Sequence, residues 1–122
     1  MHLNINSDKP IFLQIAEGIE DAILAGAFVE ESQIPSITEF SITYKINPAT
    51  ALKGINILVD NGIVYKKRGL GMFVATGAVN QLLMKRKKEF YENYIVNLIN
   101  EAKRLHIGET EIKSMIERGF IQ

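Results

Sequence analysis

The sequence contains no cysteine and no tryptophan, and it has only three prolines. Without cysteine, disulfide bonds and thiolate metal sites are excluded and nothing indicates secretion, so we expect a reducing, cytoplasmic setting. No stretch approaches the roughly 18 uninterrupted apolar residues that a membrane span needs, and residues 1–12 lack the charged segment and apolar run of a signal peptide. The sequence therefore predicts a protein without membrane insertion or targeting.

An excess of basic residues, which would favour a nucleic-acid-binding protein, is also missing. Fourteen Lys and Arg balance fourteen Asp and Glu, and residues 1–78 hold six basic against eight acidic residues. Because salt screens exposed charges beyond about 10 Å, the placement of charge matters more than its total. Lys66, Lys67 and Arg68 are consecutive and Lys53 could approach them, whereas the acids between residues 17 and 31 belong to another segment. Such a local basic edge on a neutral body predicts modest non-specific affinity for nucleic acid.

The 122 residues, 47% of them hydrophobic, suffice for one compact domain with an appendage. From Pro10 to Gly26 the apolar residues recur at three- and four-residue steps, which predicts an amphipathic helix. Ser7 or Asp8 is its expected cap, with Pro10 in the first turn, and Gly26 ends it. The apolar stripe consists of Ile11, Phe12, Ile15, Ala16, Ile19, Ala22 and Ile23.

A second, shorter helix is expected from Ile37 to Tyr44. Pro35 prevents an earlier start, and Ser36 is placed to cap the helix. Glu39 follows three residues after Ser36, which is the spacing of a capping box. Residues 45–47 then form a tight turn.

A third helix begins directly after this turn. Asn47 is the expected cap and Pro48 occupies the first helical position. The helix ends at Asp60 or Asn61, and Gly62 follows where a left-handed residue is needed. Two helices joined by so short a turn cross steeply and present the start of the second one outward, which is the geometry of a recognition helix.

After Gly62 the pattern changes from helical to extended. Residues 63–65 and 72–75 are β-prone runs on either side of residues 66–71, which are basic and contain two glycines. This pattern predicts a hairpin whose turn depends on glycine. Helix, turn, helix and hairpin in this order indicate a winged helix-turn-helix, with the basic tip of the wing beside the recognition helix.

Residues 79–105 keep a helical spacing of apolar residues over a length too great for a lone surface helix. Gly108 interrupts the pattern, and residues 109–111 open a second short helix with acids in its first turn. The simplest use of this apolar surface is dimerisation, which would place two recognition helices on one palindromic site. So short a tail is not expected to enclose a ligand cavity of roughly several hundred Å³. The expected dimer contacts are Leu82, Leu83, Phe90, Tyr94, Ile95, Leu98, Ile99, Ala102 and Leu105.

The predicted fold class is thus α+β and mostly helical. Residues 1–77 form the winged helix-turn-helix, and residues 78–122 form a two-helix dimerisation tail. The basic run Lys85–Lys88 is most simply a solvated helix face, with phosphate contact as the alternative.

Several motifs together resemble the GntR family of bacterial transcription regulators. They are the run from Pro10 to Phe28, the Ile34–Ser36 turn, the helix start at residues 47–50 and the wing from Asp60 to Val74. The short helical tail resembles the YtrA-like branch. The resemblance implies a homodimer that binds operator DNA, with the recognition helix in the major groove and the wing tip near the minor groove. For the YtrA-like branch it further implies control of operons for ABC transporters.

The resemblance also implies residue roles. Ser36 matches a position that contacts the DNA backbone, while Thr50 and Lys53 match recognition-helix contacts. Thr38 and Leu52 stand where many members have arginine, so two side chains that could read guanine are missing. The operator sequence therefore cannot be inferred from the operators of relatives. The candidate DNA-binding residues are Ser36, Thr38, Asn47, Ala49, Thr50, Leu52, Lys53, Lys66, Lys67, Arg68, Gly69 and Gly71.

Leu52 has two interpretations. An apolar helix residue most often belongs to the core, but Ile46, Ala51, Ile55 and Leu58 already fill the buried stripe of this helix. If Leu52 is exposed, it could contact a thymine methyl group. The wing cations similarly have an alternative as a solvated turn.

No catalytic site, metal or cofactor is expected. Gly69 and Gly71 lack the third glycine and the following helix of a dinucleotide-binding loop. His2 and His106 have no ligand-like spacing around them. We therefore expect a dimeric transcription regulator, most simply a repressor. The alternatives are a winged-helix module that binds protein through Leu52, Ile57 and the wing, and a small-ligand sensor with a pocket between tail and DNA-binding domain.

Overall fold

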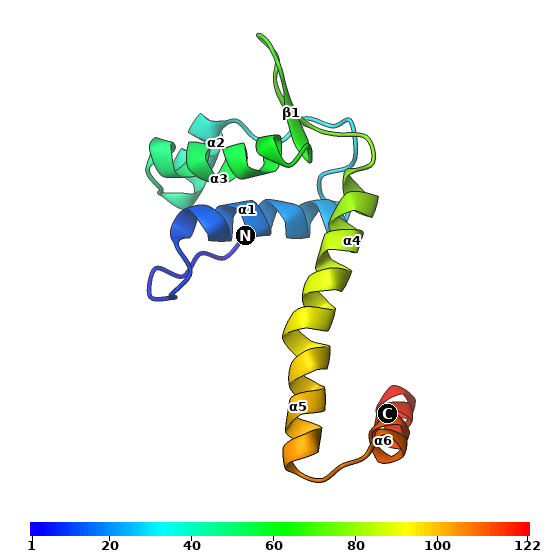
Figure 1. Cartoon of the computed structure of the whole chain (residues 1–122). Helices are drawn as coiled ribbons and strands as arrows, with labels where there is room; N and C mark the ends of the chain where they lie inside the picture. Colours follow the sequence, from blue (N-terminus) through cyan, green and yellow to red (C-terminus); the bar gives the residue numbers. More distant parts are fainter. The chain divides into compact units, whose positions relative to one another are not determined.

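Residues 1–122 are described by a computed structural model in which helices dominate and a single hairpin supplies the strands (Figure 1). The elements are α1 (Ile11–Leu24), α2 (Ile37–Tyr44), α3 (Pro48–Asp60), β1 (Val64–Lys67), β2 (Gly71–Val74), α4 (Ala78–Phe90), the π-helical segment η1 (Tyr91–Ile95), α5 (Val96–Arg104) and α6 (Glu109–Ile121). The mostly helical α+β class is confirmed. None of the helices is both long and apolar enough to cross a membrane.

The core of the first part of the chain is built on the packing of α1 against α3. Gly54 makes this packing close, because a Cβ atom there would lie 2.6 Å from the Phe12 carbonyl oxygen and 3.0 Å from the Ile15 side chain. The hairpin and the start of α4 complete the same core. Its fully buried members include Ile15, Ile19, Ile23, Ala51, Ile55, Leu58, Val74 and Leu82.

The start of α1 differs from the prediction. Pro10 is its N-cap, and no side chain caps the helix, so the expected cap at Ser7 or Asp8 is wrong. The Ser7 hydroxyl instead accepts a hydrogen bond from the Lys9 amide at 3.1 Å, within a local turn. Gln14 ties the preceding arm to α1, because its side chain bonds both the amide and the carbonyl of Asn4 at 2.8 Å.

The predicted ends of α2 and α3 are confirmed. Ser36 and Glu39 form the reciprocal capping box, with both hydrogen bonds at 3.1 Å. Asn47 caps α3 by accepting a bond from the Ala49 amide at 2.8 Å. Gly62 has a positive φ of 74°, as the end of this helix requires.

The hairpin has a shorter turn than predicted. Lys66 and Lys67 continue β1 and pair with Met72 and Gly71 of β2, so the loop contains only residues 68–70. A third extended segment also joins the hairpin, because backbone hydrogen bonds connect residues 31–34 to β2. No local pattern predicts this segment, since its partners lie about forty positions away.

The chain divides into units of residues 1–84 and 85–122, rather than after residue 77. The first turns of α4 belong to the first unit because Ala78 and Leu82 are buried in its core. In the second unit, α5 and α6 border a hollow of about 470 Å³, lined mainly by Ile95, Leu98, Ile99, Ala102, Ile107, Ile112 and Ile116. The hollow reaches a volume of several hundred Å³ but is partly open to the surface, so the expectation that so short a tail would enclose no ligand cavity stays a prediction.

Candidate nucleic-acid interface

The outward face of α3 carries a row of exposed side chains one helical turn apart. Ala49, Lys53 and Asn56 lie opposite the buried stripe of this helix, and Leu52 flanks them. Leu52 keeps 40% of its surface exposed, so its interpretation as a core residue is wrong. Asn56, which was not among the predicted contacts, belongs to the same face because it lies seven residues after Ala49.

Lys53 is held in place on this face by an aromatic ring. Its Nζ atom lies 4.0 Å from the centre of the Phe12 ring on α1. Ala49, Leu52, Lys53 and Asn56 line a shallow hollow of about 340 Å³ together with Phe12, Ile57 and Asp60. A cation held over a ring at a surface hollow is placed to meet an anion without first giving up much side-chain freedom.

The starts of α2 and α3 supply the shorter polar groups. The Ser36 hydroxyl accepts a bond from the Glu39 amide, which leaves its own proton free to donate to a phosphate oxygen. Thr38 is exposed on the first turn of α2, whereas Thr50 is half-buried in α3. Asn47 uses its side-chain oxygen as a cap and keeps its amide NH₂ group as a donor.

The hairpin separates the three predicted wing cations. Tyr65, Lys67 and Phe73 share one face, where the Lys67 Nζ atom lies 4.5 Å from the centre of the Phe73 ring and 5.7 Å from that of Tyr65. Lys66 points to the other face, since side chains alternate along a strand. Lys66 and the loop residue Arg68 make no ion pair and are exposed, so they are the freer cations for a phosphate.

Both predicted wing glycines have positive φ, but only one of them also faces a neighbouring side chain. Gly69 has φ 77° in the loop and faces open space. Gly71 has φ 123°, and a Cβ atom there would lie 2.5 Å from the Gln33 side-chain nitrogen. The same nitrogen donates a hydrogen bond to the Leu70 carbonyl at 2.7 Å. Gln33 is thus a neighbour of the wing that the sequence did not reveal.

Two acids expected in a separate segment lie at the base of the wing. Glu31 accepts bonds from the hydroxyls of Thr76 and Tyr65, the latter at 2.6 Å, and these bonds hold its pKa below the ordinary value of 4.5. The same carboxylate raises the pKa of Tyr65. Glu30 accepts from the amides of Gly77 and Val79 at the start of α4, which likewise lowers its pKa.

The tail residues predicted to form a dimer fall into two groups. Leu82 is fully buried in the core of the first unit and Ala102 is nearly so, so neither offers surface to a partner, and assigning them to the interface was wrong. Ile95 and Leu98 are half-buried beside the hollow next to α6. Exposed apolar side chains remain at Leu83, Phe90, Tyr94, Ile99 and Leu105, and also at Tyr91, Val96, Ile116, Phe120 and Ile121, which are not among the expected dimer contacts.

Most side chains of the basic run Lys85–Lys88, at the start of the second unit, already interact with other groups of the chain. Lys85 and Lys88 each face a glutamate one turn later at 3.9 Å, and Arg86 also has a partner. These pairs fit the interpretation as a solvated helix face better than phosphate contact.

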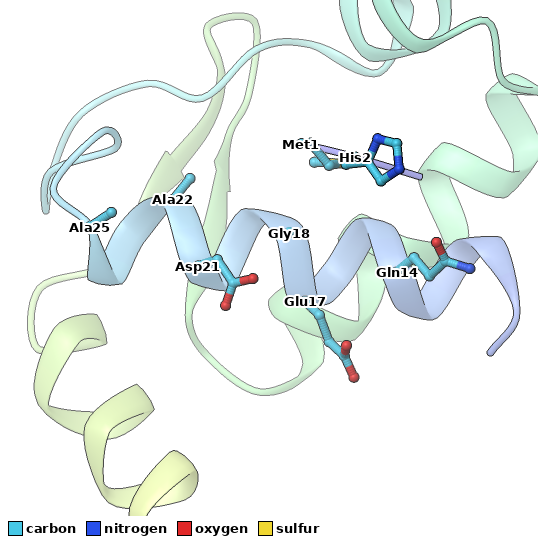
Figure 2. A pocket seen from close by; sticks show the side chains of 8 residues that line it. All are labelled: Met1, His2, Gln14, Glu17, Gly18, Asp21, Ala22 and Ala25. Carbon is cyan, nitrogen blue, oxygen red and sulfur yellow. The ribbon is translucent and has the colours of Figure 1, made fainter. Parts of the chain in front are cut away.

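A larger hollow of about 500 Å³ lies along α1 beside the N-terminal arm (Figure 2). Met1 and His2 lie above it, and Gln14, Glu17 and Asp21 line the helix side. No group of three His, Asp or Glu side chains there or elsewhere could hold a metal ion.

The chain has relatives both among known sequences and among solved structures, although no family model matches it. It is 31% identical over 125 residues to the uncharacterized HTH-type transcriptional regulator YhcF of Bacillus subtilis strain 168, covering 98% of this chain and all of YhcF. A solved GntR-family regulator from Bacteroides thetaiotaomicron is 33% identical, with TM-score 0.79 over 91% of this chain and 96% of its own. The DNA-binding domain of AraR, solved in complex with operator ORX1, is 28% identical with TM-score 0.55, covering 62% of this chain and 93% of that domain. These relatives are regulators and not enzymes.

Proposed function

The chain belongs to the GntR family of DNA-binding transcription regulators, and on this premise we propose that it represses transcription as a homodimer bound to palindromic operator DNA. The outward face of α3 carries this proposal. Leu52, Lys53 and Asn56 form a surface of apolar, cationic and amide groups, which are the three kinds of side chain that read base edges and phosphates in the major groove. Lys66 and Arg68 on the wing would add phosphate contacts beside it.

Modest specificity per protomer makes a dimer necessary in this proposal. No arginine stands on α2 or α3 to form bidentate contacts with guanine. Two linked binding domains convert weak half-site binding into stable occupancy of a full site. The exposed apolar residues of the tail, led by Phe90 and Tyr94, supply the proposed dimer surface. Occupancy of an operator then obstructs transcription without any effector.

The test is selection of bound sites from random DNA with the full chain, followed by affinity measurements at increasing salt. We expect a palindromic site and a steep decrease of affinity, with a slope of about 0.9 in log–log form for each phosphate that the protein neutralises. Lys53→Ala should reduce both affinity and slope. Lys113→Ala, which removes an exposed cation of the tail, serves as the matched control.

Failure to select any DNA, together with a protein complex insensitive to salt, would favour the protein-binding module instead. If Lys53→Ala left the salt dependence of DNA affinity unchanged, Lys53 would not be part of the DNA interface.

The apolar hollow beside α5 and α6 favours a second, compatible function as a sensor of a small apolar ligand. Its volume of about 470 Å³ falls in the range of drug-sized ligand sites. A ligand there would act on the tail and hence on dimerisation. Release of the selected operator by an apolar compound would support this function, and release that persists after Ala102→Phe fills the hollow would count against it.

A further inference from the structure

Residues 31–34 bond to the hairpin at several positions along its length. At the tip, the Gln33 side chain donates to the Leu70 carbonyl at 2.7 Å. In the middle, the Ile34 amide donates to the Met72 carbonyl at 2.9 Å, and the Val74 amide donates to the Ser32 carbonyl at 3.0 Å. We call residues 31–34 the clamp segment, since they add a third extended element to a sheet of two strands.

Gln33 meets the tip of the wing at two adjacent points. Besides its bond to the Leu70 carbonyl, its side-chain amide occupies the volume in which a side chain at Gly71 would lie. Both points join residues that are far apart in the chain. No other side chain hydrogen-bonds residues 68–71, so Gln33 is the link between the tip and the rest of the first unit.

The tip depends on such a link because it has little packing of its own. Leu70 is 65% exposed, and Arg68 and Gly69 are exposed as well. A hairpin of two four-residue strands is marginally stable without support from neighbouring elements. The direction of the tip, and with it the position of the Arg68 guanidinium, is therefore fixed from outside the hairpin.

We infer that Gln33 is a positioning residue for DNA binding, which holds the wing so that Lys66 and Arg68 reach the phosphates without itself touching DNA. This inference rests on the proposed function and adds a residue outside the helix-turn-helix and the wing. Its physical basis is that a preorganised group gives up less conformational entropy on binding than one that must first be ordered.

The test replaces Gln33 by Met in the full chain, which keeps the length of the side chain and removes its hydrogen bond. With the selected operator as probe, we expect affinity to fall about fivefold to tenfold, because two cations must be ordered on binding. The salt slope should decrease by up to about 1 for each phosphate that a wing cation no longer reaches, and the preferred base sequence should not change.

Gln81→Met is the matched control. The Gln81 side chain also donates to a distant backbone carbonyl, that of Asn61, at 2.7 Å, but it does not bond the wing. This variant should bind the operator like the original chain. Amide hydrogen exchange at residues 68–71 should rise in Gln33→Met and not in Gln81→Met, a readout that needs no DNA.

A double-mutant cycle separates positioning from direct contact with DNA. In a chain that already carries Lys66→Ala and Arg68→Ala, Gln33→Met should reduce affinity no further, since the cations it positions are gone. A full penalty in that background, or unchanged affinity of Gln33→Met alone, overturns the inference while leaving the proposed function intact. An original chain that selects no DNA overturns both.

Discussion

Gly54 shows how a single residue sets the distance between two helices. The Phe12 carbonyl of α1 lies where a side chain at position 54 would be. A backbone atom cannot move aside as a flexible side chain can. Gly18 makes a useful contrast, since a Cβ atom there would meet only the Met1 side chain, at 2.7 Å. The two glycines lie in helices of the same unit, but replacing each by alanine should change the free energy of unfolding in opposite directions.

Gly54→Ala should lower the free energy of unfolding by about 1–3 kcal/mol, because the added methyl overpacks the contact between α1 and α3. Gly18→Ala should instead raise it by about 0.5–1 kcal/mol, since alanine is the better helix former and Met1 can shift. Urea unfolding monitored by circular dichroism measures both. Equal effects of the two substitutions would contradict this account of Gly54.

In the proposed DNA interface, Leu52 is the exposed apolar residue on the outward face of α3. We expect Leu52→Ala to relax the preference for thymine at one position of each half-site, because the shorter side chain no longer reaches the methyl group. Leu52→Met, which keeps an apolar side chain of similar volume, should retain the preference. Site selection with both variants is the measurement, and an unchanged preference in Leu52→Ala would remove Leu52 from base recognition.

Among the elements, the junction between the wing and α4 depends on two carboxylates. Glu31 joins Tyr65 of β1 to Thr76, and Glu30 binds the free amides at the start of α4. These donors stabilise the charged form of both carboxylates. Because each pKa is lowered in the folded chain, the stability they contribute is present above the ordinary value of 4.5 and disappears as pH falls through the lower folded value.

We predict that the urea midpoint falls as the pH is lowered from about 5 to about 3, because these carboxylates become protonated. The double variant Glu30→Gln and Glu31→Gln should be less stable at neutral pH and should show a shallower fall over this window. Glu117→Gln, which removes an exposed carboxylate without a hydrogen bond in the structure, should keep the original profile. A double variant as steep as the original chain would exclude the junction as the cause.

For the molecule as a whole, the proposed dimer depends on the second unit. Phe90 and Tyr94 are 55% and 66% exposed, and their ring centres lie 5.4 Å apart. Two neighbouring exposed aromatic rings are typical of the apolar centre of an interface between chains.

Phe90→Ala combined with Tyr94→Ala should weaken dimerisation and lower affinity for the full palindrome by up to about 10²-fold, while affinity for an isolated half-site stays unchanged. Alanine preserves helix formation, so the effect reports the surface and not the fold. Sedimentation equilibrium and binding to both DNA lengths measure it. Asn100→Ser is the control, and a double variant that still dimerises fully would place the interface elsewhere.

Local sequence was enough to predict the order of the elements, because capping and helix periodicity act over short distances. Ser36 with Glu39, Asn47 with Pro48 and the glycine at residue 62 act on their immediate neighbours, and the structure confirms each of them. Each of these features depends on residues within about one helical turn.

Contacts between residues that lie far apart in the sequence were instead determined by tertiary packing. Gln33 reaches the wing tip, Glu31 reaches Tyr65, and Lys67 is placed over aromatic rings while Lys66 is not. Packing also removed Leu82 from the expected dimer surface by burying it in the first unit. Most of these contacts join residues tens of positions apart in the sequence. Hydrophobic packing and the register of the hairpin determine such contacts, whereas the local spacing of residues does not.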